Sequence, residues 1–180
     1  MPAADPDRTT APRPGLSLAE HAVLALLVEH PAHGFAVARA LGPQGDVGRA
    51  YQVARSAVYR AIDRLVDDGL VHPVGEEPGA RAPARTIVAP TAAGRAADAA
   101  WIEAPVAHVR DVRTAVLVKL ALLDRRGADP ATLVAAQRDA LGPLVERLAA
   151  RAEAASGFER TLALWRVTSA RAALAFLDAL

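Results

Sequence analysis

Residues 54–74, ARSAVYRAIDRLVDDGLVHPV, decide the fold that we expect for this chain. At 100° per residue, one face of a helix through this stretch collects the apolar side chains of Val58, Ala61, Ile62 and Leu65. Gly69 then ends the helical pattern, and an apolar run typical of a β-strand follows it. The stretch therefore predicts a short amphipathic helix with one packed face, leading directly into a strand.

The other side of this helix carries residue types that contact phosphates and base edges of DNA. They are Arg55, Ser56, Tyr59, Arg60 and Arg64. A surface helix of any soluble protein also carries arginines, so the helix alone does not separate DNA binding from an ordinary solvated face. Tyr59 has a second interpretation as a half-buried packing residue, because its helical angle places it at the edge of the apolar face.

The order of the neighbouring segments favours DNA binding. Ser17 and Glu20 have capping-box spacing before a helix that is apolar nearly all round and should be buried. A two-turn helix is expected over residues 35–41, and a strand over residues 70–74. Residues 75–84 form a turn-rich tip, and Arg85 opens a second short strand. This order is typical of a winged helix-turn-helix with a two-stranded wing.

The predicted wing carries two arginines, Arg81 and Arg85, that could reach the DNA backbone or minor groove. Glu76 and Glu77 lie in the same hairpin and would be repelled there. An ordinary solvated hairpin is an equally good interpretation, so both stay open.

Residues 105–180 are expected to form three helices with a kink at Gly142-Pro143. In the last helix, apolar or small residues recur at spacings of three and four. They are Leu162, Trp165, Ser169, Ala172, Phe176 and Ala179. Such a seam packs against partner helices, either within one chain or across a dimer.

Composition limits the other classes of function. The chain is 52% hydrophobic with few aromatic residues, which favours a folded, mainly α protein. It has no cysteine, no apolar run long enough to span a membrane and no signal peptide, so we expect a cytoplasmic protein. Histidines, serines and carboxylates form no metal-binding or catalytic pattern, and we expect neither an enzyme nor a cofactor. Net charge is +1, so any attraction to DNA must come from locally placed arginines.

Three divisions of the chain follow from these patterns. Residues 1–15 are rich in proline and lack apolar periodicity, which predicts a disordered tail. Residues 16–104 are expected to form the winged helix, and residues 105–180 an antiparallel helical dimerisation domain.

Six segments in order resemble the PadR family of bacterial winged-helix transcriptional regulators, in the longer form with a helical C-terminal domain. They are SLAEHAVLALL, HGFAVARAL, SAVYRAIDRLVDDGLV, GARAPARTIVAPTAAGR, AAWIEAPV and HVRDVRTAVLVKLALLDRRG. The chain departs from that family at Val88, where a tyrosine is usual, and at Ala54, where a serine-like helix cap is usual.

The resemblance implies a homodimer that binds an inverted-repeat operator in double-stranded DNA and acts as a repressor. It also implies a small aromatic or amphipathic effector, for which Trp101, Lys119 and Trp165 are the candidate residues. Both tryptophans have a more ordinary interpretation as core residues, and Lys119 as a lysine that snorkels or pairs with a carboxylate. A protein-interaction module and a small-molecule-binding protein or unrecognised enzyme are the alternative functions.

Overall fold

The computed structural model describes residues 15–78 and 84–180. The predicted tail over residues 1–15 therefore lies almost wholly outside the described residues, and so does Arg81. Within the described ranges, no helix combines the length and the apolar content that a bilayer crossing requires.

Helix α1 (Leu18–Glu29) lies at the centre of the N-terminal half. Its predicted capping box is present, since Glu20 N donates to Ser17 Oγ and Ser17 N donates to the Glu20 carboxylate. All six residues from Ala22 to Leu27 are buried, because α3, α4 and α6 pack around the helix. The expectation of an enclosed first helix is confirmed.

The predicted winged helix-turn-helix is confirmed, with one correction to its sheet. Helix α2 (Gly34–Ala40) precedes α3 (Arg55–Asp67), and Gly69, at φ 68°, turns the chain from α3 into the wing. Strands β2 (Val71–Glu77) and β3 (Arg85–Pro90) form the wing.

The sheet has three strands, in the order β1-β3-β2, where two were predicted. The additional strand β1 (Ala32–His33) has only two residues, too few for a recognisable alternation. The first wing strand also runs past the predicted end at Val74, because an irregularity between Pro73 and Gly75 lets pairing resume as far as Glu77.

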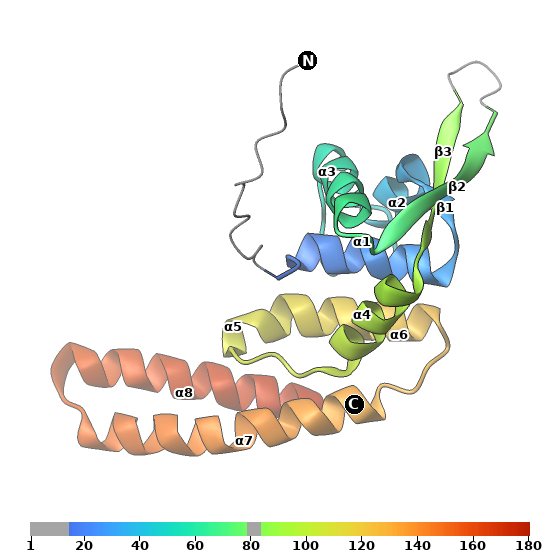
Figure 1. Cartoon of the computed structure of the whole chain (residues 1–180). Helices are drawn as coiled ribbons and strands as arrows, with labels where there is room; N and C mark the ends of the chain where they lie inside the picture. Colours follow the sequence, from blue (N-terminus) through green and yellow to red (C-terminus); the bar gives the residue numbers. More distant parts are fainter. Residues whose placement is uncertain (1–14, 79–83) are drawn as a thin grey trace, which may run out of the picture.

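The C-terminal half is helical throughout (Figure 1). Its elements are α4 (Ala92–Glu103), α5 (Val109–Asp111), η1 (Val112–Val116), α6 (Leu117–Arg125), α7 (Ala131–Ala154) and α8 (Gly157–Asp178). Helices α7 and α8 form a long antiparallel pair, and α7 continues through Pro143. The mainly α fold class is therefore confirmed.

The main hydrophobic core crosses position 105, where the sequence predicts a domain boundary. The core around α1 includes Val118 and Leu122 from α6 and Leu133 from α7. Helix α6 thus completes the core of the winged helix as well as leading into the α7–α8 pair.

The residues of the predicted seam of α8 are half-buried or exposed, and none of them is fully buried. The side chains of α8 that are buried are instead Ala163, Val167, Ala170 and Leu177. Trp165 is 71% exposed, so its expected place in a core is wrong for this single chain. The two apolar stripes of α8 therefore have different environments: one is packed on α7, and the other is half-buried at Phe176 and exposed at Trp165.

Candidate nucleic-acid interface

The exposed side of α3 carries the side chains that the sequence singles out. Arg55, Ser56, Tyr59 and Arg60 are all exposed, while Val58 and Leu65 on the opposite side are fully buried. Ala54 makes no side-chain cap, so the N–H groups of the first turn are not satisfied by a capping oxygen. The start of α3 therefore presents cationic and hydrogen-bonding groups to solvent.

Phe35 joins this surface to the wing. The ring is 39% exposed, and the guanidinium carbons of Arg55 and Arg85 lie 5.2 Å and 4.9 Å from its centroid. Arg55 also lies 5.8 Å from the centroid of Tyr59. We call Phe35, Tyr59, Arg55 and Arg85 the Phe35 cluster.

The Phe35 cluster draws its members from three elements: the start of α2, the start of α3 and the start of β3. In Figure 1, α3 and the wing lie on the side of the molecule facing away from α7 and α8. Within the described part of the chain, neither Arg55 nor Arg85 forms an ion pair with a carboxylate. The cluster is thus a local positive site on a protein of nearly zero net charge.

Phe35 is available for packing in the helix expected over residues 35–41, yet the structure leaves its side chain 39% exposed. A helical wheel contains the signal, because Phe35 lies about 200° from Val37 and so opposite the buried side of α2. No signal in the sequence pairs Phe35 with Arg85, since that contact depends on the wing folding back towards α2.

Arg64 lies away from the cluster. Its guanidinium is 3.5 Å from Glu20 Oε1 and 3.4 Å from Asp68 Oδ2, so its charge is already engaged by carboxylates. Arg60 stands free of ion pairs among the described residues and remains on the exposed side of α3.

Two of the three predicted effector residues meet at the junction of the N- and C-terminal halves. The ring of His21 on α1 stacks on Trp101 of α4 at 4.6 Å and 5°, and Lys119 Nζ of α6 lies 4.8 Å from the same Trp101 ring. We call these three residues the junction cluster.

Lys119 is the buried member of the junction cluster, and His21 and Trp101 are half-buried. Lys119 is 2% exposed and donates a hydrogen bond to the Ala104 carbonyl, so its expected roles as a snorkelling lysine or a partner of a carboxylate are wrong. Burial lowers the pKa of Lys119 to about 8. Burial, and then the charge of Lys119, lower the pKa of His21 to about 4, against the opposing effect of Glu20. Trp101 is partly buried against the core, as the more ordinary interpretation expected.

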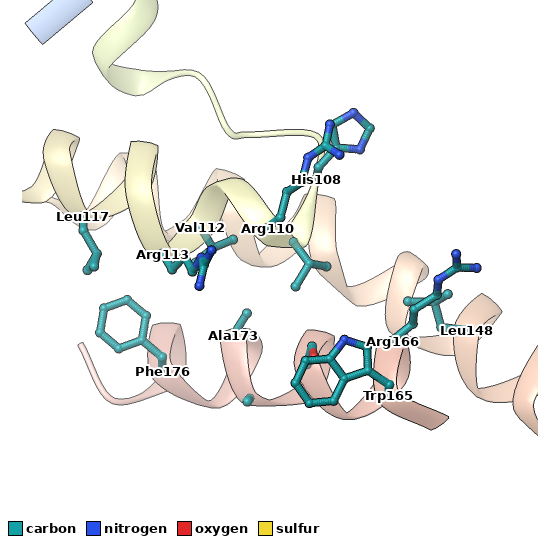
Figure 2. Close-up of a pocket in the computed structure, with 13 residues that line it drawn as sticks. His108, Arg110, Val112, Arg113, Leu117, Leu148, Trp165, Arg166, Ala173 and Phe176 are labelled. Carbon is teal, nitrogen blue, oxygen red and sulfur yellow. The ribbon is translucent and has the colours of Figure 1, made fainter. Parts of the chain in front are cut away.

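Trp165 lies in a groove between α8 and the α5–η1 segment, which we call the α8 groove. Its volume is about 860 Å³. Figure 2 shows Trp165 and Phe176 on α8 facing Arg110, Val112 and Arg113 across it. The groove therefore combines flat apolar surface with arginine side chains.

In the ranges 15–78 and 84–180, no three His, Asp or Glu side chains come together in a group that could hold a metal ion. The acidic residues that approach one another instead pair with arginines, as Glu29 and Asp46 do with Arg125 at 2.9 and 2.7 Å.

Comparison with known proteins finds similarity in structure. No family model matches the chain, and no curated protein matches its sequence. The crystal structure of Bacillus subtilis PadR in complex with operator DNA aligns with a TM-score of 0.49 at 13% identity, covering 92% of this chain and 97% of that one. The crystal structure of smu.1604c from Streptococcus mutans UA159 aligns with a TM-score of 0.42 at 13% identity, covering 88% of this chain and 95% of that one. At 13% identity the similarity concerns the fold alone, and what this chain binds is inferred from its own residues.

Proposed function

We propose that this chain is a homodimeric, PadR-like transcriptional regulator that binds double-stranded DNA through α3 and the wing. The observation that carries the proposal is the Phe35 cluster, in which an arginine of the recognition helix and an arginine of the wing converge on one exposed ring. Like charges that are held together without a carboxylate partner suit an anionic ligand, and the DNA backbone is such a ligand.

The surface allows a division of roles among its residues. Ser56 and Arg60 lie one turn apart on α3 and would meet base edges or phosphates in the major groove. Arg55 and Arg85 would meet the phosphate backbone, together with the exposed Tyr59, whose hydroxyl can donate a hydrogen bond to a phosphate. Arg64 is left out of this set because Glu20 and Asp68 already hold its guanidinium.

The α8 groove supports the homodimer. A tryptophan that is 71% exposed, in the same groove as Phe176, leaves apolar surface that a second copy of α8 would cover. Two copies would place two α3 helices on one DNA duplex, and half-sites about 34 Å apart would then form an inverted repeat.

A small aromatic effector has one supporting feature, which is the same groove. Trp165 offers a plane for stacking, and Arg110 and Arg113 offer charge to an acidic group. Trp101 and Lys119 are weaker candidates, because Lys119 is buried and already lies over the Trp101 ring.

Two alternative functions make different predictions. A small-molecule-binding protein would bind a ligand tightly and would not bind DNA. A protein-interaction module would use the same surface for a protein partner, which the balanced charge of residues 16–95 would suit.

Electrophoretic mobility shift with the DNA upstream of its own gene tests the function. The wild-type protein should bind, and Arg60→Ala should weaken specific binding by roughly 1–3 kcal/mol. Arg147→Ala is the matched control, since Arg147 is exposed on α7, far from α3, and its loss removes the same charge. Failure of the wild-type protein to bind at any salt concentration would exclude the regulator.

A further inference from the structure

We propose that Phe35 is a positioning residue for DNA binding, holding Arg55 and Arg85 together, and that His33 keeps Glu77 away from Arg85. This inference rests on the proposed DNA-binding function. Neither His33 nor Phe35 is assigned a contact with bases. Both act through the arginines.

The first step is the placement of two like charges. The two guanidiniums lie 5.2 Å and 4.9 Å from the centroid of one ring, although they repel each other. The negative face of an aromatic ring attracts a cation and so offsets part of this repulsion. A phosphate bound between the two guanidiniums would offset the remaining repulsion. The arrangement therefore favours binding of an anion.

The second step concerns the carboxylate that faces Arg85 across the wing, Glu77. Glu77 and Arg85 are directly opposite each other in the β2–β3 ladder, where opposite charges ordinarily pair. Glu77 Oε2 lies instead 3.2 Å from His33 Nε2. His33 Nδ1 accepts a hydrogen bond from Ala36 N at 3.0 Å, so in the neutral ring the proton is on Nε2 and points to Glu77. The Arg85 guanidinium is consequently not neutralised by Glu77, and it can contact the Phe35 ring and a DNA phosphate.

The third step concerns the residue between them. A Cβ added to Gly34 would come within 2.8 Å of Tyr59 Cε1 and 3.2 Å of Ile62 Cδ1. Glycine therefore permits the close approach of α2 to α3 that brings Phe35 next to Arg55. Residues 33–35 therefore make three different contacts. His33 binds Glu77 of β2, Gly34 leaves room for the side chains of α3, and the ring of Phe35 contacts Arg55 of α3 and Arg85 of β3.

Fluorescence anisotropy of the full chain with a labelled duplex from upstream of its own gene tests the role of Phe35. Phe35→Leu should weaken binding roughly tenfold, since two cation–π contacts are lost, while Phe35→Tyr should bind like wild type. In the Arg55→Ala, Arg85→Ala background, Phe35→Leu should have no further effect, and thermal unfolding should be unchanged by Phe35→Leu.

The outcomes separate this inference from the proposed function. An equal loss from Phe35→Leu with and without the two arginines would overturn the positioning role, as would wild-type affinity of Phe35→Leu. Absence of wild-type binding to any duplex would instead remove the proposed function itself.

A second pair of variants tests His33. His33→Ala should weaken binding, because the released Glu77 can pair with Arg85, and adding Glu77→Gln should restore most of the affinity. Because a neutral glutamine cannot neutralise Arg85, restoration follows from charge rather than from repaired packing. If the double variant binds no better than His33→Ala, the role of His33 is overturned.

Discussion

At the scale of single residues, His21 shows how burial becomes a dependence on pH. Its ring lies between α1 and α4, stacked on Trp101, and Nδ1 is buried without a hydrogen-bond partner among the described residues. Burial lowers its pKa from 6.5 to about 4, so the folded protein keeps the ring neutral in mild acid.

We predict that the free energy of unfolding decreases as pH falls from 6.5 to 4. In this range the unfolded chain takes up a proton at His21 while the folded protein does not, so acid favours the unfolded state. The full pKa shift of His21 corresponds to a loss of unfolding free energy of at most about 3 kcal/mol. Urea unfolding at pH 7 and near pH 4 measures it. His21→Phe keeps a stacked ring that cannot titrate, so its acid loss should be smaller, and an equal loss in both proteins would contradict the prediction.

Residue-scale features separate into those that sequence can predict and those that it cannot. The exposure of Arg55 and Arg60 follows from helical periodicity, and the structure agrees. The contact of His21 with Trp101 joins residues 80 positions apart and depends on how α1 and α4 pack. Periodicity gives the face of a helix but not the helix that covers it.

At the scale of elements, Asp98 fixes α4 to the end of α6. Its side chain is 3% exposed, and its two oxygens lie 2.9 Å from Nη1 and 3.2 Å from Nη2 of Arg126. Arg126 also donates to the Ala25 carbonyl of α1, so three helices meet at this pair.

We predict that Asp98→Asn lowers the free energy of unfolding by about 2 kcal/mol, because the partly buried Arg126 loses its closer carboxylate partner and keeps only Glu29, whose Oε1 lies 3.8 Å from Arg126 Nε. Asp178→Asn is the control, since its partner Arg138 lies 2.7 Å away in an exposed pair. The control should change stability by less than about 1 kcal/mol. Similar urea midpoints for both variants would show that burial does not strengthen the pair.

Gln137 fixes the segment between α4 and α5. The side chain is fully buried, accepting from Val106 N at 2.7 Å and donating to Val106 O at 3.0 Å. We predict that Gln137→Glu destabilises the fold by about 2–3 kcal/mol at pH 7, because a carboxylate cannot donate to the carbonyl.

The same variant should regain stability in acid relative to wild type. Burial raises the pKa of an introduced carboxyl, so the folded variant binds a proton at higher pH than the unfolded chain does, and protonation restores a donor. Gln137→Leu should also be less stable than wild type, but by an amount independent of pH. Chemical unfolding of the three proteins at several pH values measures the difference, and a pH-independent loss in Gln137→Glu would contradict it.

The errors in the predicted elements have local causes. Gly75, Glu76 and Glu77 have the composition of a turn, yet pairing continues through them because the irregularity at Pro73 absorbs a register shift. Pro73 fits there because β2 is an edge strand, where a missing N–H leaves no neighbour unpaired.

At the scale of the whole molecule, α8 explains why assembly is harder to predict than fold. Trp165, Ala172 and Phe176 recur at helical spacing, and so do Ala163, Val167 and Ala170. Both stripes satisfy the same periodic rule, and only the structure shows that the second one packs on α7. The first is therefore the stripe available to another molecule.

We predict that Trp165→Glu converts a dimer into a monomer. A charge among the residues that line the α8 groove would have to be buried against the second copy, whereas Trp165 would cover apolar surface there. Sedimentation equilibrium should give the mass of one chain for Trp165→Glu and of two chains for wild type. Ala175→Glu adds the same charge at an exposed position of α8 outside the groove and should remain dimeric.

Loss of the dimer should also weaken DNA binding, because each recognition helix would then engage its half-site independently of the other. Affinity for a duplex with both half-sites should fall to that for a single half-site, while circular dichroism shows unchanged helix content. If Trp165→Glu stays dimeric and binds like wild type, then the copies associate elsewhere, and the groove is left for a small ligand that titration with aromatic acids would detect by Trp165 fluorescence.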